Sequence, residues 1–232
     1  MSDIDGGNKV KIATGEFLGT GSWAPDNFHL SFVELAASAG AKAYLVSSDG
    51  SGLRRSPPMG RALGDAVWSP DQKSVYVNVV EVTKRIITVW KWNADGSTPE
   101  KFGDNCGEIL DVDPGGEYLL GSVSQGEKTG IYELSIVDRK CTVLLPGVSS
   151  AGLFAQDGKS FLYAVASRGE VAIYRQVWKD GKNIGVPQVA LKVPFAFPEY
   201  YAGNAYDFSR DLSTIVYARP GGHADLYLLS QK

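Results

Sequence analysis

VWSPDQKSVYV, residues Val67 to Val77, places an apolar run, a Ser-Pro-Asp tripeptide and an alternating Val/Tyr run next to one another. Proline fixes φ, and aspartate accepts a hydrogen bond from the backbone two residues on, so the tripeptide predicts a tight turn. The spacing of two between apolar residues after the turn predicts a strand. The stretch therefore predicts two strands joined by a tight corner.

The same pattern recurs along the chain. An apolar residue, a corner ending in Asp or Gly, and a strand follow one another in WAPDNFHLSF from Trp23, WSPDQKSVYV from Trp68, VDPGGEYLLG from Val112, FAQDGKSFLYA from Phe154 and FSRDLSTIVYA from Phe208. The first residues of these segments lie 45, 44, 42 and 54 positions apart. A second series of turns has a similar period, at Asp5-Gly6, Asp49-Gly50, Asp95-Gly96, Asp138-Arg139 and Asp180-Gly181. Two independent marks with one period indicate an internal repeat.

Each period holds four short strand candidates and no helix candidate. Four-stranded units that recur every 40 to 45 residues or so are typical of a β-propeller. The sequence therefore predicts an all-β fold of four-stranded antiparallel blades, in one domain over residues 1–232, with blades at 18–62, 63–106, 107–149, 150–194 and 203–230. The apolar residue before each corner, Trp23 and Trp68 among them, is expected to plug the space between neighbouring blades.

The last repeat lacks an outer strand, and the first residues of the chain supply a candidate. Lys9 to Ile12 alternates Lys with Val or Ile, so we expect it to pair with the last blade and close a ring of five blades. A closed ring leaves no sheet edge exposed. The alternative is that the chain is a fragment of a larger ring.

WSPDQKSVYV, together with the later VWKWNADGSTPEKF, resembles the WD-repeat-like unit of bacterial TolB-type β-propellers. DPGG, AQDG and SRDL in the last three units each lack part of the Ser-Pro-Asp pattern. The resemblance implies a propeller of the kind found in periplasmic translocation proteins, in extracytoplasmic sensor domains fused to kinases or regulators, and on peptidases. The first two settings imply binding of a protein or ligand, and they favour a periplasmic location in a parent with further domains.

The composition argues against several classes of protein. The net charge of −3 and the pI of about 5.5 argue against nucleic-acid binding through bulk charge. No apolar run approaches the ~20 residues that cross a bilayer, and the first residues lack the features of a signal peptide. Cys106 and Cys141 have only His29 and His223 to assist them, so no zinc site is expected. We expect two buried free thiols, with a disulfide as the alternative in an exported parent.

Catalytic motifs are scarce. No nucleophile elbow is present, two histidines supply a Ser-His-Asp triad poorly, and the glycines mark turns rather than phosphate loops. The sequence therefore predicts a non-catalytic binding or scaffold module without a cofactor or metal. The alternative is a five-bladed glycoside hydrolase, which needs two carboxyl groups about 5 to 9.5 Å apart in the channel. Its candidates, in or beside innermost strands, are Asp65, Glu108, Asp111 and Asp207.

The predicted contact surface is the rim opposite the corners, where the turns vary. Its charged residues are Lys84, Arg85, Lys128, Arg168 and His223. Roughly ten extra residues lie between Asp180 and Arg210, in the segment VPFAFPEYYAGNAY, with the aromatic residues Phe195, Phe197, Tyr200 and Tyr201. Aromatic anchors on a stiff loop are typical of binding hot spots, so a protein or peptide partner is expected there. The alternative is that these rings cap the last blade or plug the channel mouth.

Overall fold

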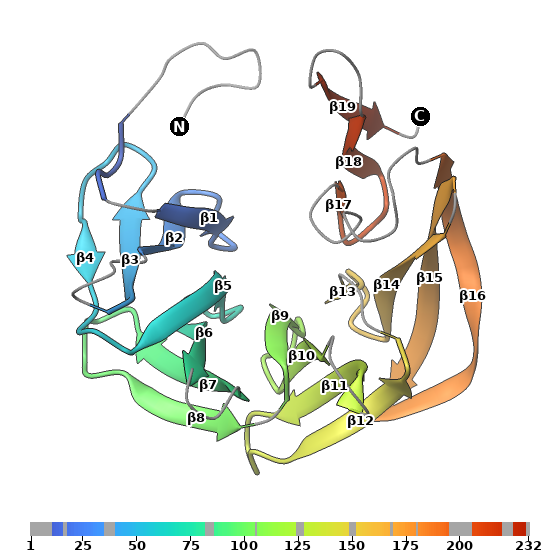
Figure 1. Ribbon diagram of the computed structural model, residues 1–232, viewed down its shortest axis with the longest axis horizontal. Helices are drawn as coiled ribbons and strands as arrows, with labels where there is room; N and C mark the ends of the chain where they lie inside the picture. Colours follow the sequence, from blue (N-terminus) through green and yellow to red (C-terminus); the bar gives the residue numbers. More distant parts are fainter. Residues whose placement is uncertain are drawn as a thin grey trace.

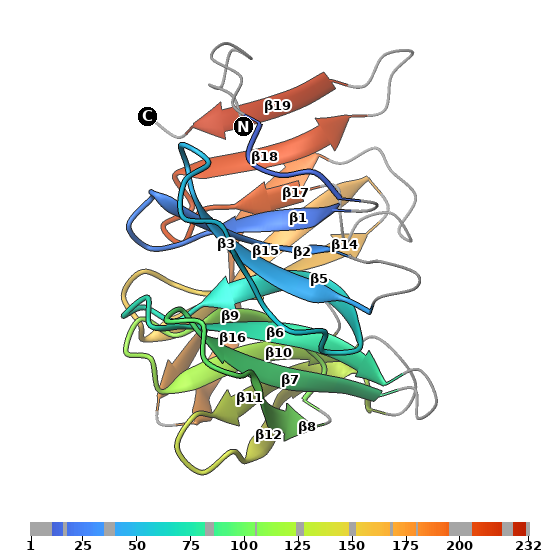
Figure 2. The same cartoon turned by 90° about the vertical axis from the view of Figure 1, so that its left-hand side faces the viewer.

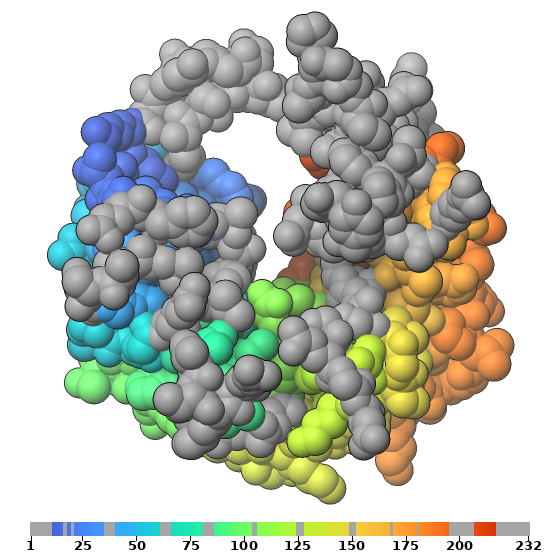
Figure 3. All heavy atoms as spheres, in the orientation of Figure 1, coloured from blue at the N-terminus to red at the C-terminus, as the bar shows by residue number. Residues whose placement is uncertain are grey.

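The computed structural model describes residues 11–15, 18–34, 40–81, 86–104, 106–123, 128–148, 152–167, 169–179, 181–194, 206–219 and 225–230. These residues form antiparallel sheets arranged around an open central channel (Figures 1 and 3). The strands run along the channel axis from one rim to the other (Figure 2). The chain is an all-β propeller, as predicted, and each sheet is called a blade below.

The strands follow the chain from the channel outward in each blade (Figure 1). The first blade consists of β1 (Leu18–Trp23), β2 (His29–Glu34), β3 (Lys42–Ser47) and β4 (Arg54–Arg55). The second consists of β5 (Arg61–Trp68), β6 (Ser74–Glu81), β7 (Ile86–Asn93) and β8 (Glu100–Asp104). The third consists of β9 (Glu108–Val112), β10 (Tyr118–Val123), β11 (Gly130–Ser135) and β12 (Cys141–Pro146). The fourth consists of β13 (Gly152–Phe154), β14 (Ser160–Ser167), β15 (Glu170–Lys179) and β16 (Lys182–Pro194). The fifth has three described strands, β17 (Tyr206–Phe208), β18 (Thr214–Arg219) and β19 (Asp225–Ser230).

All five corners share one backbone geometry. The first corner residue donates its N–H to the carbonyl five residues on, at 2.8 to 3.0 Å, in the pairs Ala24–His29, Ser69–Ser74, Asp113–Tyr118, Ala155–Ser160 and Ser209–Thr214. In the second corner, Asp71 Oδ1 also accepts the N–H of Lys73 at 3.1 Å. In the third, which has no aspartate at that place, Asp113 accepts the N–H groups of Gly115 and Tyr118 instead. The predicted corner therefore forms even where Ser-Pro-Asp is incomplete.

The fourth residue of each corner has a positive φ, and it is Asn27, Gln72, Gly116, Gly158 or Leu212. A side chain in the left-handed region costs about 1 kcal/mol, which glycine avoids. We expect Gln72→Gly to raise the free energy of unfolding by about 0.5 kcal/mol, because it relieves this backbone cost. The gain is less than the full cost, since glycine loses more conformational entropy on folding. Urea denaturation measures this. Leu212→Gly is the control: Leu212 is buried against Phe208 and Ile215, so this change should destabilise the protein. A loss of stability in Gln72→Gly contradicts the prediction.

The core lies between neighbouring blades. One buried cluster joins each consecutive pair, and the plug residues Trp68, Val112, Phe154 and Phe208 belong to the clusters that their blades share with the preceding blade. These four are 7%, 2%, 0% and 6% exposed. The predicted plug is wrong for Trp23, which is 47% exposed. Its strand pairing is the same as that of the other four, since each pairs with the residue seven positions further on, here Leu30. Trp23 belongs to the first blade, so it faces the junction between the first and last blades rather than an internal junction between consecutive blades.

The thiols are not free. Cys106 and Cys141 form a disulfide with their Cα atoms 5.7 Å apart, so the prediction of two free thiols is wrong. Cys106 lies in the link between the second and third blades, and Cys141 begins the outer strand of the third. The fold brings these two positions together, although they are 35 residues apart in the chain.

The proposed closing strand is described only from Lys11. Lys11 and Ile12 are not in a strand, whereas Lys9 and Val10 lie outside the described residues. Ile12 and Ala13 pack against the first blade, on the face that carries Phe32 and Tyr44. Closure of the ring therefore stays a prediction.

The extra residues between Asp180 and Arg210 lie partly in a longer outer strand. β16 has 13 residues, whereas β8 has 5 and β12 has 6. Two register shifts in its pairing with β15 absorb part of the length. The remainder, residues 195–205, lies outside the described residues.

Candidate functional site

Most of the predicted contact residues lie outside the described part of the chain. They are Lys84, Arg85, Arg168, Phe195, Phe197, Tyr200, Tyr201 and His223. Lys128 is described, and its carbonyl accepts the hydroxyl of Tyr132 at 2.7 Å. The opposite rim, which carries the five corners, is called the corner rim below, and it is described almost completely.

The four predicted channel carboxylates have different surroundings. Asp65 lies in β5, and its side chain is outside the described atoms. Glu108 and Asp111 lie in β9, half-buried and buried respectively. Asp207 in β17 is exposed, and its Oδ1 accepts the N–H of Phe208 at 2.8 Å.

Asp111 binds two groups from two other blades. Its Oδ2 accepts the N–H of Phe154 at 2.7 Å, and its Oδ1 accepts Arg210 Nη2 at 2.6 Å. Burial raises the pKa of Asp111 to about 6, against the opposing effects of the Arg210 charge and the backbone N–H groups. Both carboxylate oxygens are thus engaged in contacts between blades.

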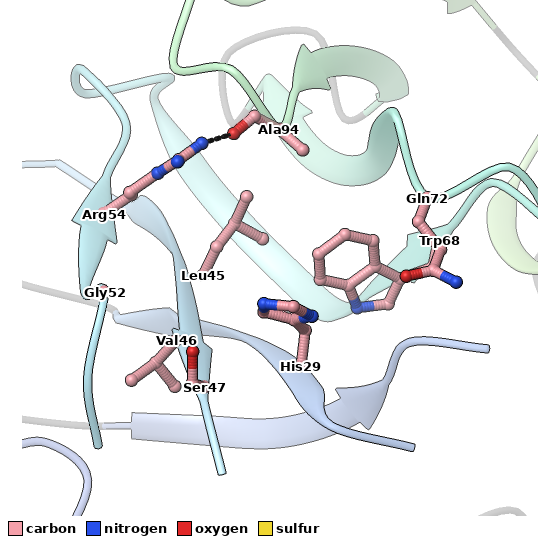
Figure 4. Close-up of a pocket in the computed structure, with 9 residues that line it drawn as sticks. All are labelled: His29, Leu45, Val46, Ser47, Gly52, Arg54, Trp68, Gln72 and Ala94. Atoms are coloured by element: carbon pink, nitrogen blue, oxygen red, sulfur yellow. Dashed lines mark hydrogen bonds between the residues drawn. The ribbon is translucent and has the colours of Figure 1, made fainter. Parts of the chain in front are cut away.

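A cavity of about 340 Å³ opens between the first and second blades at the corner rim (Figure 4). It is lined by His29, Leu45, Val46, Ser47, Gly52, Arg54, Trp68, Gln72 and Ala94. Leu45 and Trp68 also belong to the core cluster between these blades, so the cavity has an apolar floor held by the core. Pre-formed cavities with apolar floors and a few polar groups are the usual form of binding sites.

The polar groups of the cavity are fixed by local hydrogen bonds. His29 Nδ1 lies 2.6 Å from Asp26 Oδ2, so Nε2 is the ring nitrogen that Asp26 does not contact. The His29 N–H, followed by its ring and the N–H of Phe28, lowers the pKa of Asp26 to about 2. Arg54, from the first blade, donates to the carbonyl of Ala94 in the second (Figure 4). Trp68 Nε1 donates to the carbonyl of Ser22 at 3.2 Å.

Exposed apolar side chains flank the cavity. Phe28 is 45% exposed and packs edge-on against His29, with ring centroids 5.1 Å apart. Leu53, next to the lining residues Gly52 and Arg54, is 48% exposed. Phe28 and Leu53 lie on adjoining turns, because Ser48 donates its N–H to the Phe28 carbonyl at 2.8 Å.

Sequence reasoning missed this site because the repeated corner rim was interpreted as purely structural. A signal was present at Phe28. The corresponding corner positions hold Lys73, Glu117, Lys159 and Ser213, so only the first unit has an aromatic residue there.

A second cavity of about 340 Å³ lies between the fourth and fifth blades, at the same rim. Its lining residues are Gln156, Asp157, Arg175, Arg210 and Asp211. Arg175 Nη1 is 3.6 Å from Asp157 Oδ2, an exposed pair that contributes little to stability. Within the described residues, no group of three or more His, Cys, Asp or Glu side chains is placed to hold a metal ion.

Solved β-propellers match this arrangement. The chain is similar to TolB from Acinetobacter baumannii, with 17% identity over 88% of this chain and 50% of that chain, at a TM-score of 0.67. It is similar to an oligogalacturonate lyase in complex with manganese, with 14% identity over 77% and 53% of the chains, at 0.61. It is also similar to the β-propeller domain of the Trilobed protease from Pyrococcus furiosus, with 15% identity over 98% and 69% of the chains, at 0.56.

These likenesses define the fold as a β-propeller. In particular it is a TolB-like β-propeller. The chain spans about half the length of the first two structures. No protein-family model matches the chain, and no curated protein matches its sequence. Among the described residues, no helix has the length and apolar character to cross a membrane.

Proposed function

We propose that the protein is a non-catalytic binding module that holds a peptide segment of a partner protein at the corner-rim cavity between its first and second blades. The observation that carries this proposal is the apolar-floored cavity with Phe28 and Leu53 exposed beside it. An apolar side chain of the partner fits the floor formed by Leu45 and Trp68. Phe28 and Leu53 contact the segment beside this floor.

The rigidity of the corners supports this proposal. Asp26 accepts the N–H groups of Phe28 and His29 at 2.8 and 3.0 Å, so the turn that carries both aromatic rings is held in place. A rigid surface loses little conformational entropy on binding. Aromatic and aliphatic anchors beside a pocket are the usual hot spots of interfaces.

Asp111 favours the binding role over glycoside hydrolysis. A glycoside hydrolase needs two carboxyl groups that are free to act on the substrate. Here both oxygens of Asp111 are engaged by Arg210 and Phe154. The enzymes among the similar structures, such as the lyase, are likenesses of fold alone.

The disulfide supports an oxidising location for this module. Disulfides form and persist in the periplasm and outside the cell and are rare in the cytosol. Together with the TolB-like fold, the Cys106–Cys141 bond favours a periplasmic site of action.

We expect the double variant Phe28→Ser/Leu53→Ser to lose peptide binding at least tenfold, because truncating a hot-spot side chain costs about 2 kcal/mol or more. A random peptide library displayed on phage is selected against the unaltered protein. The enriched peptides are then titrated against both proteins by fluorescence anisotropy. Both side chains are exposed, so the melting temperature should stay unchanged.

The matched control is Phe197→Ser/Tyr201→Ser, in the aromatic segment that the sequence also offers as a contact surface. If the enriched peptides bind Phe28→Ser/Leu53→Ser as tightly as the unaltered protein, the corner-rim site is wrong. If the control variant alone loses binding, the partner binds the opposite rim. If no peptide is enriched, the peptide-binding role is contradicted.

A further inference from the structure

Arg210 connects three blades through one side chain. It lies in the corner of the fifth blade, between β17 and β18. Its Nη1 donates to the Phe154 carbonyl of the fourth blade at 3.0 Å, and its Nη2 donates to Asp111 Oδ1 of the third blade at 2.6 Å. The Arg210 carbonyl in turn accepts the N–H of Gln156 at 3.4 Å. No other described ion pair joins blades that are not neighbours.

The pair combines a fixed anion with a releasable cation. The Asp111 side chain is 8% exposed, and it is also held by the Phe154 N–H at 2.7 Å. The Arg210 side chain is 41% exposed and lines the open cavity between the fourth and fifth blades. Asp111 is therefore the more firmly held partner of the pair, whereas the Arg210 side chain has solvent beside it.

We propose that the Asp111–Arg210 pair is an acid-released latch, which holds the corner of the fifth blade against the third and fourth blades and opens when Asp111 takes up a proton. A neutral carboxyl still accepts the Phe154 N–H but no longer attracts the guanidinium. The fifth blade then keeps the bonds that do not depend on this charge, from Arg210 Nη1 to the Phe154 carbonyl and from the Gln156 N–H to the Arg210 carbonyl. It also keeps its apolar contacts with the fourth blade through Phe208, Leu212 and Ile215.

The surroundings of Asp111 set the pH at which the latch opens. The ionisable residues around Asp111 come from its own element and from the elements beside it. They are Glu108 and Asp113 next to it in the chain, Arg61 and Asp65 on β5, Tyr76 and Glu81 on β6, Lys91 on β7, Tyr118 on β10, Tyr206 and Asp207 on β17, and Arg210 and Asp211 in the corner of the fifth blade. β13 carries none. Burial is the largest effect on Asp111 and the Arg210 charge is the largest opposing one, and their balance raises the pKa of Asp111 to about 6. The latch is therefore closed at pH 7.5 and largely open at pH 5.

Global stability has the opposite pH dependence, and this separates a latch from general acid denaturation. Because the folded pKa of Asp111 is raised above its ordinary value of 3.8, this group contributes stability that grows as the pH falls from above 6 towards 4. Acid thus opens the fifth blade locally while the Asp111 contribution to the whole fold becomes more favourable.

Hydrogen–deuterium exchange at pH 7.5 and pH 5.0 tests the latch, with rates expressed as protection factors. Hydrogen bonds to charged groups contribute about 1.5 to 3 kcal/mol, so we expect protection of residues 206–216 to fall about tenfold or more at pH 5.0. Protection of β9 and β10 should stay constant. Asp111→Asn should show the low value at both pH values, and so should Arg210→Gln. Asp207→Asn, which removes an exposed carboxyl from the same blade, should behave as the unaltered protein.

Equal protection of residues 206–216 at the two pH values overturns the proposal. It is also overturned if Arg210→Gln retains the pH dependence, or if protection falls equally in β9 and β10, since the whole ring then loosens together. If Asp111→Asn does not fold, Arg210→Gln and the unaltered protein still decide between these outcomes.

Discussion

Phe154→Ala should lower the free energy of unfolding by about 3 to 5 kcal/mol, the usual cost of removing a buried phenylalanine ring. Phe154 is fully buried, and it packs edge-on against Trp178 with ring centroids 5.4 Å apart. The cluster around it joins the third and fourth blades through Leu120, Phe161 and Trp178. Urea denaturation followed by tryptophan fluorescence measures the loss.

Trp23→Ala is the matched control, because Trp23 occupies the same position of the repeat. Its side chain is larger than that of Phe154, yet 47% of Trp23 is exposed. The expected loss is therefore about 1 kcal/mol or less. If Trp23→Ala costs as much as Phe154→Ala, the junction between the first and last blades is as tightly packed as the internal junctions, which contradicts the prediction.

Deletion of residues 1–13 should cost about 3 kcal/mol or more, because we propose that this segment closes the ring. At each internal junction, an apolar residue in the outer strand or just after it packs into the cluster shared with the next blade: Met59, Phe102, Leu144 and Val193. Ile12 continues this series, with spacings of 47, 43, 42 and 49 residues. It packs on the first blade against Phe32 and Tyr44, which are 4% and 3% exposed. Deletion exposes these rings and removes the half-buried Ile12.

Deletion of residues 1–8 is the control, since it keeps Lys9 to Ala13. It should change the urea midpoint little. If both deletions leave the midpoint unchanged, closure by the N-terminal segment is wrong, and the first blade is covered in another way.

The sequence predicted the parts of the fold that depend on local hydrogen bonds. The corners could be found because Pro, Asp and Gly restrict the backbone within a few residues, and the alternating strands follow directly. The exposure of Trp23 could not be found, because it depends on where a repeat stands in the ring and not on the repeat itself. The disulfide was missed for a related reason: Cys106 and Cys141 meet only through the placement of one blade beside another.

The candidate site was harder to predict, because its parts come from several turns. His29 and Arg54 belong to the first blade, whereas Trp68, Gln72 and Ala94 belong to the second. No single motif contains them. Asp111 was predicted from its place on an innermost strand, but its partner Arg210 stands 99 residues further along the chain. The two residues meet only because the blades curve around the channel, and the sequence does not show this curvature.

Side-chain hydrogen bonds connect each of the first three blades to the next. Ser31 Oγ donates to the Ala66 carbonyl at 2.9 Å, Asn78 exchanges two bonds with the backbone of Ile109, and Asp111 accepts the Phe154 N–H. These bonds are buried, where an unmade bond costs about 1 to 3 kcal/mol. Adjacent blades therefore cannot slide along the channel axis independently. A force applied to the first blade along this axis is therefore transmitted through these bonds to the fourth blade, and it displaces the channel wall as one unit.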